Sequence, residues 1–200
     1  MGNILSIMTE STRYGKLHLY IGCMYAGKTT KLIETYKDAL DNDDYVAILT
    51  HSTENRYSLH EISTHDQQKV SCLKYSSIQS FVENEQVIIE KSSIILVDEG
   101  QFFDDLLEVL VLVEKYNKIV YVFGLDGDFK RNTFGKILEL IPLCDSVEKL
   151  TAQCKCGKKA IFSNRTIQNE NQILVGSIDV YEPLCRTCYI EHNIFKNHLN

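Results

Sequence analysis

The eight residues from Gly22 to Thr29, Gly-Cys-Met-Tyr-Ala-Gly-Lys-Thr, match the phosphate-binding pattern G-x-x-x-x-G-K-[ST]. This pattern requires a strand before it and a helix after it. Residues 17–22 form a short apolar run, and residues 28–40 place apolar side chains at helical spacing. The two glycines allow backbone N–H groups to converge on phosphate oxygens, Lys28 can reach the β- and γ-phosphates, and the Thr29 hydroxyl can bind Mg²⁺. The motif therefore predicts an α/β protein that binds a nucleotide.

The rest of the chain alternates in the same way. Apolar, β-branched runs predict strands at 45–50, 69–75, 93–98 and 118–124, and helices are expected within 76–90 and over 102–116. Residues 51–68 are polar and lack a regular period, so a long loop is expected there. Together these elements predict a P-loop NTPase-like (RecA-like) fold, in which helices flank a mostly parallel sheet.

An acidic pair follows the most hydrophobic strand. The run Ile94-Ile95-Leu96-Val97 delivers Asp98 to the carboxyl end of its strand, where open α/β sheets bind ligands. Asp98 is expected to hold Mg²⁺ opposite Thr29, and Glu99 can then take a proton from an acceptor. The pair by itself fits a kinase, and it equally fits an ATPase that activates water.

Four of the seven cysteines lie near the C-terminus, as the pairs Cys154-Lys155-Cys156 and Cys185-Arg186-Thr187-Cys188. Two close pairs of thiolates at this separation favour a tetrahedral structural Zn²⁺, with free thiols as the alternative. Cys23, Cys72 and Cys144 are expected to be small apolar residues. Composition changes near residue 150 and helical patterning is not expected after it, which predicts a small metal-bound unit there.

Composition restricts the partners and the compartment. Twenty-one basic and 27 acidic residues give a net charge of −6, which argues against binding to a nucleic acid. Neither a membrane span nor a secretory signal is expected, and the clustered cysteines favour a reducing, cytoplasmic location. The first six residues, Met1-Gly2-Asn3-Ile4-Leu5-Ser6, also fit the short pattern for myristoylation of Gly2.

The order of these motifs closely resembles that of the type II thymidine kinases. The likeness runs from about residue 16 to residue 189 and is carried by five blocks: 22–30, Asp98-Glu99-Gly100-Gln101-Phe102-Phe103, Leu125-Asp126-Gly127-Asp128-Phe129, Phe134-Gly135 and Lys149-Leu150-Thr151-Ala152, before the paired cysteines. The resemblance implies a flexible leader (1–16), a P-loop kinase domain (17–150), a zinc-binding lasso domain (151–191) and a tail (192–200).

The resemblance also implies the roles of individual residues. Glu99 matches the general base, while Thr29 and Asp98 match the Mg²⁺ ligands. Residues expected to contact ATP are Gly22, Met24, Gly27, Lys28, Thr29, Thr30, Arg56, Asp98 and Gln101. Residues expected around thymidine are Met24, Phe102, Leu125, Phe129, Phe134, Ser163, Gln172, Ile173, Leu174, Val175, Gly176 and Tyr181. Residues 172–176 match a strand whose backbone binds thymine, and Asp128 and Lys130 are interpreted as ordinary variations.

The implied reaction is transfer of the ATP γ-phosphate to the 5′-hydroxyl of thymidine, which gives thymidine monophosphate. ATP, Mg²⁺ and a structural Zn²⁺ are the implied cofactors. The resemblance further implies a homotetramer that thymidine triphosphate inhibits. The competing hypothesis is a P-loop ATPase whose zinc ribbon acts on nucleic acid or protein, and a kinase with a relaxed base preference is a nearer alternative.

Overall fold

The computed structural model describes residues 14–53, 61–63, 69–174 and 180–197. A six-stranded sheet with only parallel pairings lies at its centre, in the order β5-β2-β6-β7-β1-β8. The strands are β1 (Lys16–Gly22), β2 (Val46–His51), β5 (Leu73–Tyr75), β6 (Ile94–Asp98), β7 (Ile119–Gly124) and β8 (Ser146–Leu150). Every residue of β6 is buried, as its uninterrupted apolar sequence predicts for a strand covered on both faces. The predicted parallel α/β sheet is confirmed.

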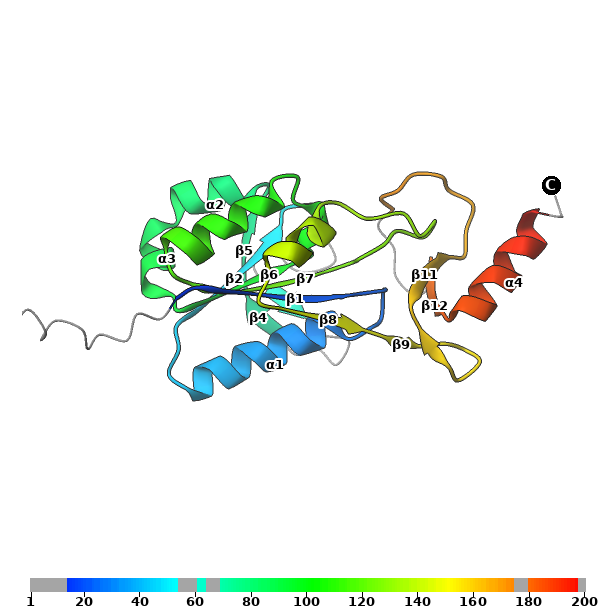
Figure 1. The fold of residues 1–200 in the computed structure, drawn as a ribbon, viewed down its shortest axis with the longest axis horizontal. Coiled ribbons are helices and arrows are strands. Elements are labelled where there is room, and N and C mark those ends of the chain that lie inside the picture. The colour runs from blue at the N-terminus through cyan, green and yellow to red at the C-terminus, as the bar shows by residue number, and fades with distance from the viewer. Residues whose placement is uncertain (1–13, 54–60, 64–68, 175–179, 198–200) are drawn as a thin grey trace, which may run out of the picture.

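Helices cover both faces of this sheet (Figure 1). Helix α1 (Lys28–Asp41) packs on one face, where Leu32 and Ile33 meet Leu96 of β6. The opposite face is covered by α2 (Ile78–Asn84), α3 (Gln86–Lys91) and the helical turns that follow β6 and β7. Successive strand residues alternate between these two cores, because side chains along a strand point to opposite faces.

The single helix predicted over 102–116 is wrong in its geometry. The segment instead forms the 3₁₀ turns η1 (Gly100–Phe102) and η2 (Leu106–Glu108), followed by the π-helical turn η3 (Val111–Lys115). The helix is broken at Phe103, which is fully buried and has an extended backbone conformation with φ −82° and ψ 111°. Two residues later, the carboxylate of Asp105 accepts hydrogen bonds from the Ile78 and Gln79 amides at the start of α2.

The irregular segment predicted between β2 and β5 contains regular structure. Strand β3 (Glu61–Ser63) pairs antiparallel with β4 (Lys69–Ser71), so the prediction of a loop is wrong for residues 61–63. The single strand predicted over 69–75 is divided at Cys72, because its first half pairs with β3 and its second half with β2. Arg56 lies outside the described residues.

The C-terminal unit combines two small antiparallel sheets with a helix. Its elements are β9 (Ala152–Gln153), β10 (Lys159–Ala160), β11 (Phe162–Arg165), β12 (Tyr181–Leu184) and α4 (Arg186–Asn197). Helix α4 contradicts the expectation that no helix follows residue 150. Cys188 and Tyr189 of this helix pack into the small core of the C-terminal unit, and this tertiary packing stabilises the helix. Among the described residues, no helix is long and apolar enough to cross a membrane.

Candidate active site

The segments of the candidate site follow the carboxyl ends of neighbouring strands in the sheet. Gly22 ends β1, Asp98 ends β6 and Gly124 ends β7, and these are neighbouring or next-neighbouring parallel strands. The C-terminal unit lies beyond the same ends of the strands (Figure 1). This is the edge at which open α/β sheets bind ligands.

The phosphate-binding loop depends on two glycines for different reasons. A Cβ on Gly22 would lie 2.4 Å from the carbonyl oxygen of Leu150, so there is no room for a side chain. Gly27 is not crowded, but it adopts φ 83°, the left-handed conformation that glycine tolerates best. Its carbonyl then accepts the first hydrogen bond of α1, from Lys31. The loop therefore presents the N-terminus of α1 toward the site.

The side chain of Lys28 is half-buried and folds back against the loop of which it is a part. Its Nζ donates hydrogen bonds to the carbonyls of Cys23 at 2.8 Å and Gly22 at 3.3 Å. Burial lowers the pKa of Lys28, and the nearby carboxylates of Glu99, Asp98 and Asp126 oppose that effect. Three acidic side chains thus surround the cation that is expected to contact phosphates.

The acidic pair is buried at the end of β6. Asp98 is 3% exposed and Glu99 is 9% exposed. Glu99 has φ 53° and ψ 42°, a left-handed conformation that costs a non-glycine residue about 1–2 kcal/mol. Strain of this kind persists where the surrounding structure enforces it, often at functional sites. The carboxylate of Glu99 accepts a hydrogen bond of 2.6 Å from the side chain of Gln101.

Aromatic side chains flank the acidic pair. The rings of Phe102 and Phe134 meet edge to face, with centroids 5.6 Å apart. His51, at the end of β2, lies against Phe102 and Phe103 and hydrogen-bonds the Ser76 carbonyl through Nε2. Phe102 is therefore held from two sides, by Phe134 and by His51. Two predicted wall residues are thereby brought together.

The C-terminal unit touches the phosphate-binding loop directly. The amide N–H of Met24 donates to Ser163 Oγ at 2.9 Å, and the Cys23 thiol donates to the Ala160 carbonyl at 3.5 Å. Ser163 is buried on β11 and Ala160 belongs to β10. Sequence reasoning placed Ser163 near a base, and the structure also joins it to the loop.

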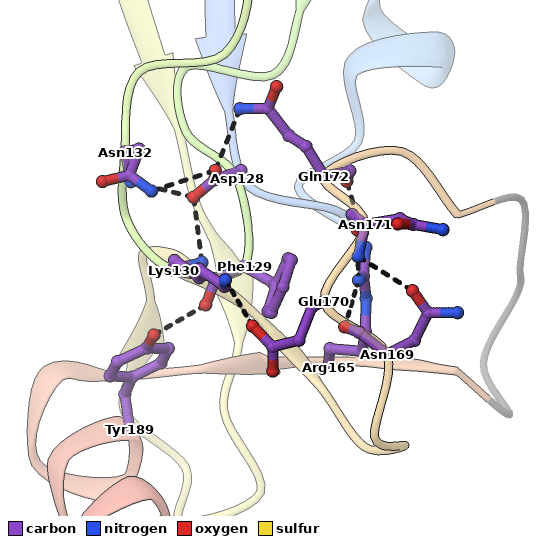
Figure 2. Close-up of polar contacts among 10 residues, drawn as sticks. All are labelled: Asp128, Phe129, Lys130, Asn132, Arg165, Asn169, Glu170, Asn171, Gln172 and Tyr189. Atoms are coloured by element: carbon purple, nitrogen blue, oxygen red, sulfur yellow. Dashed lines mark hydrogen bonds and ion pairs between the residues drawn. The ribbon is translucent and has the colours of Figure 1, made fainter.

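Arg165 is a central residue that sequence reasoning missed. It is only 3% exposed, and its guanidinium donates to the carbonyls of Asn169, Asn171 and Gln172. It also donates to the hydroxyl of Tyr181 at 2.6 Å. Figure 2 shows how this one side chain gathers the loop after β11 around itself. The alternation of β11 does not predict a buried arginine, because arginine is rarely buried without partners.

The same guanidinium lies over Phe129, with its Cζ 3.7 Å from the ring centroid. Tyr181 in turn donates to the carbonyl of Leu174 at 3.1 Å. Three residues predicted around thymidine, Phe129, Leu174 and Tyr181, are thus connected through Arg165. Leu174 is the last residue that the structure describes before the gap at 175–179.

Asp128 also has a larger role than an ordinary variation. It is buried, and its carboxylate accepts hydrogen bonds from the backbone amides of Lys130 and Asn132, which closes a tight turn. It further accepts from the Gln172 side chain at 3.0 Å (Figure 2). Lys130 pairs with Glu170 beside this contact. The turn after β7 is therefore attached to the loop after β11, where Gln172 contributes a side chain.

Some predicted site residues are not brought into this network. Thr30 is exposed on α1, and Ile173 is 55% exposed. The described residues Gln172, Ile173 and Leu174 do not form a strand, contrary to the expectation for 172–176. Val175, Gly176 and Arg56 lie outside the described residues.

The four C-terminal cysteines converge as their spacing predicts. The Sγ atoms of Cys154, Cys156, Cys185 and Cys188 all lie within 4.8 Å of one another, and Cys156 and Cys185 are 3.6 Å apart. Tetrahedral Zn²⁺ with Zn–S bonds of about 2.3 Å would separate its sulfurs by about 3.8 Å. Gly157, at φ 83°, closes the turn after the shortened Cys-Lys-Cys pair.

The local chemistry also suits a metal. Burial opposes ionisation of Cys154, but the backbone amides of Cys156 and Cys185 and the neighbouring thiols lower its pKa to about 6. A thiolate is the form that binds zinc. No disulfide joins these residues, so the cluster fits a closed zinc site of four thiolates.

The sheet, the loop and the acidic pair define a P-loop nucleotide-binding protein with an added four-cysteine unit. Within that class, the chain belongs to the thymidine kinase family, because the family model described as thymidine kinase matches residues 15–189.

Relatives agree over most of the chain. A thymidine kinase of Oryza sativa subsp. japonica is 41% identical over 184 residues, which cover 90% of this chain and 68% of the relative. Thymidine kinase a of Arabidopsis thaliana is 39% identical over 196 residues, which cover 96% of this chain and 82% of the relative. The thymidine kinase of Vaccinia virus (strain Western Reserve) is 38% identical over 178 residues, which cover 88% of this chain and 98% of the relative.

Proposed function

We propose that this protein transfers the γ-phosphoryl group of ATP to the 5′-hydroxyl of thymidine, which gives thymidine monophosphate and ADP. The single observation that carries the proposal is the buried pair Asp98 and Glu99, placed at the sheet edge beside Lys28. Membership of the thymidine kinase family supports the choice of acceptor.

The roles follow from the chemistry of phosphoryl transfer. The amides of the loop and the N-terminus of α1 hold the phosphates, and Lys28 leaves the loop carbonyls to neutralise the charge of the transferring group. Thr29 and Asp98 would hold Mg²⁺, which supplies further neutralisation of phosphate charge. Glu99 accepts the proton of the 5′-hydroxyl as that oxygen attacks.

Selection of thymidine is assigned to the apolar walls and to the loop after β11. Met24, Phe102, Leu125, Phe129 and Phe134 provide the walls, and the backbone of 172–176 binds the base edge beside Ser163 and Tyr181. A base with a different arrangement of hydrogen-bond donors and acceptors would leave buried polar groups unsatisfied, at a cost of about 1–3 kcal/mol each. The Arg165 network supports this assignment, because it fixes the start of that loop.

The proposal is tested by ADP release from ATP–Mg²⁺ with thymidine, with deoxycytidine, with deoxyguanosine and without a nucleoside. Release that requires thymidine, together with thymidine monophosphate, supports the kinase, and activity with deoxycytidine would indicate a relaxed base preference. ADP release at the same rate with and without a nucleoside would indicate the ATPase and overturn the proposal. Glu99→Gln should bind ATP without turnover, while Glu83→Gln on the exposed face of α2 serves as its control.

The four-cysteine cluster is proposed to hold one structural Zn²⁺ in a separate C-terminal domain that begins near residue 151. The change from the edge strand β8 to the hairpin of β9 and β10 supports that boundary. Because four thiolates leave no open position on the metal, the zinc takes no part in the reaction. Its role is to shape the loop after β11, the proposed substrate loop.

The quaternary and regulatory assignments rest on the family. A homotetramer is proposed, and Val147 on the edge strand β8 and Leu143 before it, each 45% exposed, are compatible with a further interface. Light scattering coupled to size exclusion would give the mass directly. Thymidine triphosphate is proposed as an inhibitor, and reduced cysteine ligands favour a cytoplasmic location.

A further inference from the structure

Gln101 has both ends of its side-chain amide occupied by protein partners. Its Nε2 donates to Glu99 Oε2 at 2.6 Å, and its Oε1 accepts from the amide N–H of Leu125 at 2.8 Å. A backbone N–H can only donate and an ionised carboxylate can only accept. One orientation of the amide therefore satisfies both partners, and only a side chain with a donor and an acceptor can do so.

The surrounding backbone is built to admit this side chain. A Cβ on Gly124, at the end of β7, would lie 2.6 Å from Gln101 Oε1 and 2.7 Å from the Cδ1 of Ile137. A Cβ on Gly135 would lie 2.1 Å from the carbonyl oxygen of Gln101. Gln101 itself is 3% exposed. Glycine at these two positions thus leaves the space that the backbone and amide of Gln101 fill.

The contact acts on a residue whose direction is already restricted. Glu99 adopts a left-handed backbone conformation, and Gln101 lies two residues later in the turn η1. The amide of Gln101 fixes one oxygen of the Glu99 carboxylate, Oε2. Through Leu125, the same amide connects Glu99 to the end of β7.

We propose that Gln101 is a positioning residue for Glu99, which holds the carboxylate in the orientation that proton transfer requires. This inference rests on the proposed function, and it assigns Gln101 a task different from the contact with ATP expected from the sequence. Orientation of a base matters in the chemical step more than in binding, so the effect belongs in kcat rather than in KM.

Gln101→Glu separates the two contacts of the amide. A glutamate can still accept the hydrogen bond from Leu125, but it loses the donor to Glu99 and places a second carboxylate against it. We expect kcat to fall by about 10- to 100-fold, part of the factor of about 10²–10⁴ that a positioned base contributes. The KM values for thymidine and for ATP should stay within about twofold. Single-turnover measurements confirm that the loss lies in the chemical step.

Gln101→Met removes both contacts at similar side-chain volume. Because Leu125 is then released as well, kcat should fall and the KM for thymidine should rise. The matched control is Gln79→Glu, since Gln79 donates to Glu83 at 2.8 Å on the exposed face of α2. That variant should have unchanged kcat and KM.

An unchanged kcat in Gln101→Glu would overturn the inference, as would a loss confined to the KM for ATP. If Gln101→Glu does not fold, as judged by thermal unfolding, Gln101→Met decides, and an unchanged kcat there overturns the inference equally. Glu99→Gln is measured in parallel. Near-normal turnover in Glu99→Gln would refute the proposed role of Glu99, whereas an inactive Glu99→Gln beside a fully active Gln101→Glu refutes only the inference.

Discussion

The backbone amide of Met24, within the phosphate-binding loop, donates a hydrogen bond of 2.9 Å to the side-chain hydroxyl of Ser163 on β11. This bond joins the loop expected to bind ATP to the unit that carries the cysteine cluster and the proposed substrate loop. The phosphate-binding loop and the C-terminal unit are therefore in direct contact.

Ser163→Ala should weaken ATP binding, because the loop loses a fixed acceptor for the Met24 amide. A buried donor left unsatisfied costs about 1–3 kcal/mol, so the KM for ATP should rise by about fivefold or more. Ser146→Ala is the control, since the exposed Ser146 hydroxyl hydrogen-bonds the His18 ring on the neighbouring strand β1. Steady-state kinetics at varied ATP measures the effect, and an unchanged KM would separate the bond from ATP binding.

Arg165→Lys should reduce the affinity for thymidine. Lysine has a single ammonium group in place of the planar fork that reaches three carbonyls, and it stacks poorly on Phe129. We expect the KM for thymidine to rise by about tenfold or more, while the KM for ATP changes little. The control is Arg131→Lys, because Arg131 is exposed and its guanidinium also lies over an aromatic ring, that of Tyr189. Equal effects on both substrates would indicate general loss of structure instead.

Removal of zinc should loosen the substrate loop while leaving the sheet intact. A strong chelator, or Cys188→Ser, should lower Tm by about 5–15 °C and raise the KM for thymidine more than that for ATP. The control is Cys144→Ser, which lies outside the cluster and should leave both Tm and the KM for thymidine unchanged. Elemental analysis is expected to find one zinc per chain in the untreated protein. A metal-free protein with full activity and stability would contradict this prediction.

ATP affinity should fall at alkaline pH because of Lys28. Burial lowers the pKa of Lys28 in the free protein, and bound phosphates favour its charged form, so ATP binding takes up a proton above that lowered pKa. For folding the sign is the opposite. Between the lowered pKa and the ordinary value of 10.5, the unfolded chain holds more protons, so this group's contribution to the free energy of unfolding rises with pH.

The measurement is the Kd for ATP at several pH values from neutral to alkaline, for the wild type and for Lys28→Met. The variant should bind weakly at every pH and lack this alkaline decline. A parallel decline in both proteins would show that another group titrates.

The sequence by itself determined the parallel sheet, the loop from Gly22 to Thr29 and the convergence of the four cysteines. Each of these depends on a local pattern: the uninterrupted apolar run of β6, a motif between a strand and a helix, and two short cysteine pairs. Local patterns survive folding because they express backbone preference and ligand chemistry within a few residues. The same patterns placed Asp98 and Glu99 at the end of a buried strand.

Only the tertiary structure decided how distant segments support that site. Asp105 accepts hydrogen bonds from the first amides of α2, and Arg165 gathers a loop that has no strand of its own over its described residues. Gln101 reaches Leu125 across the ends of two strands, and Asp128 binds Gln172. These contacts join polar groups far apart in the chain, and burial makes them necessary, because each buried group must find a partner. No single stretch of sequence specifies which partner that is.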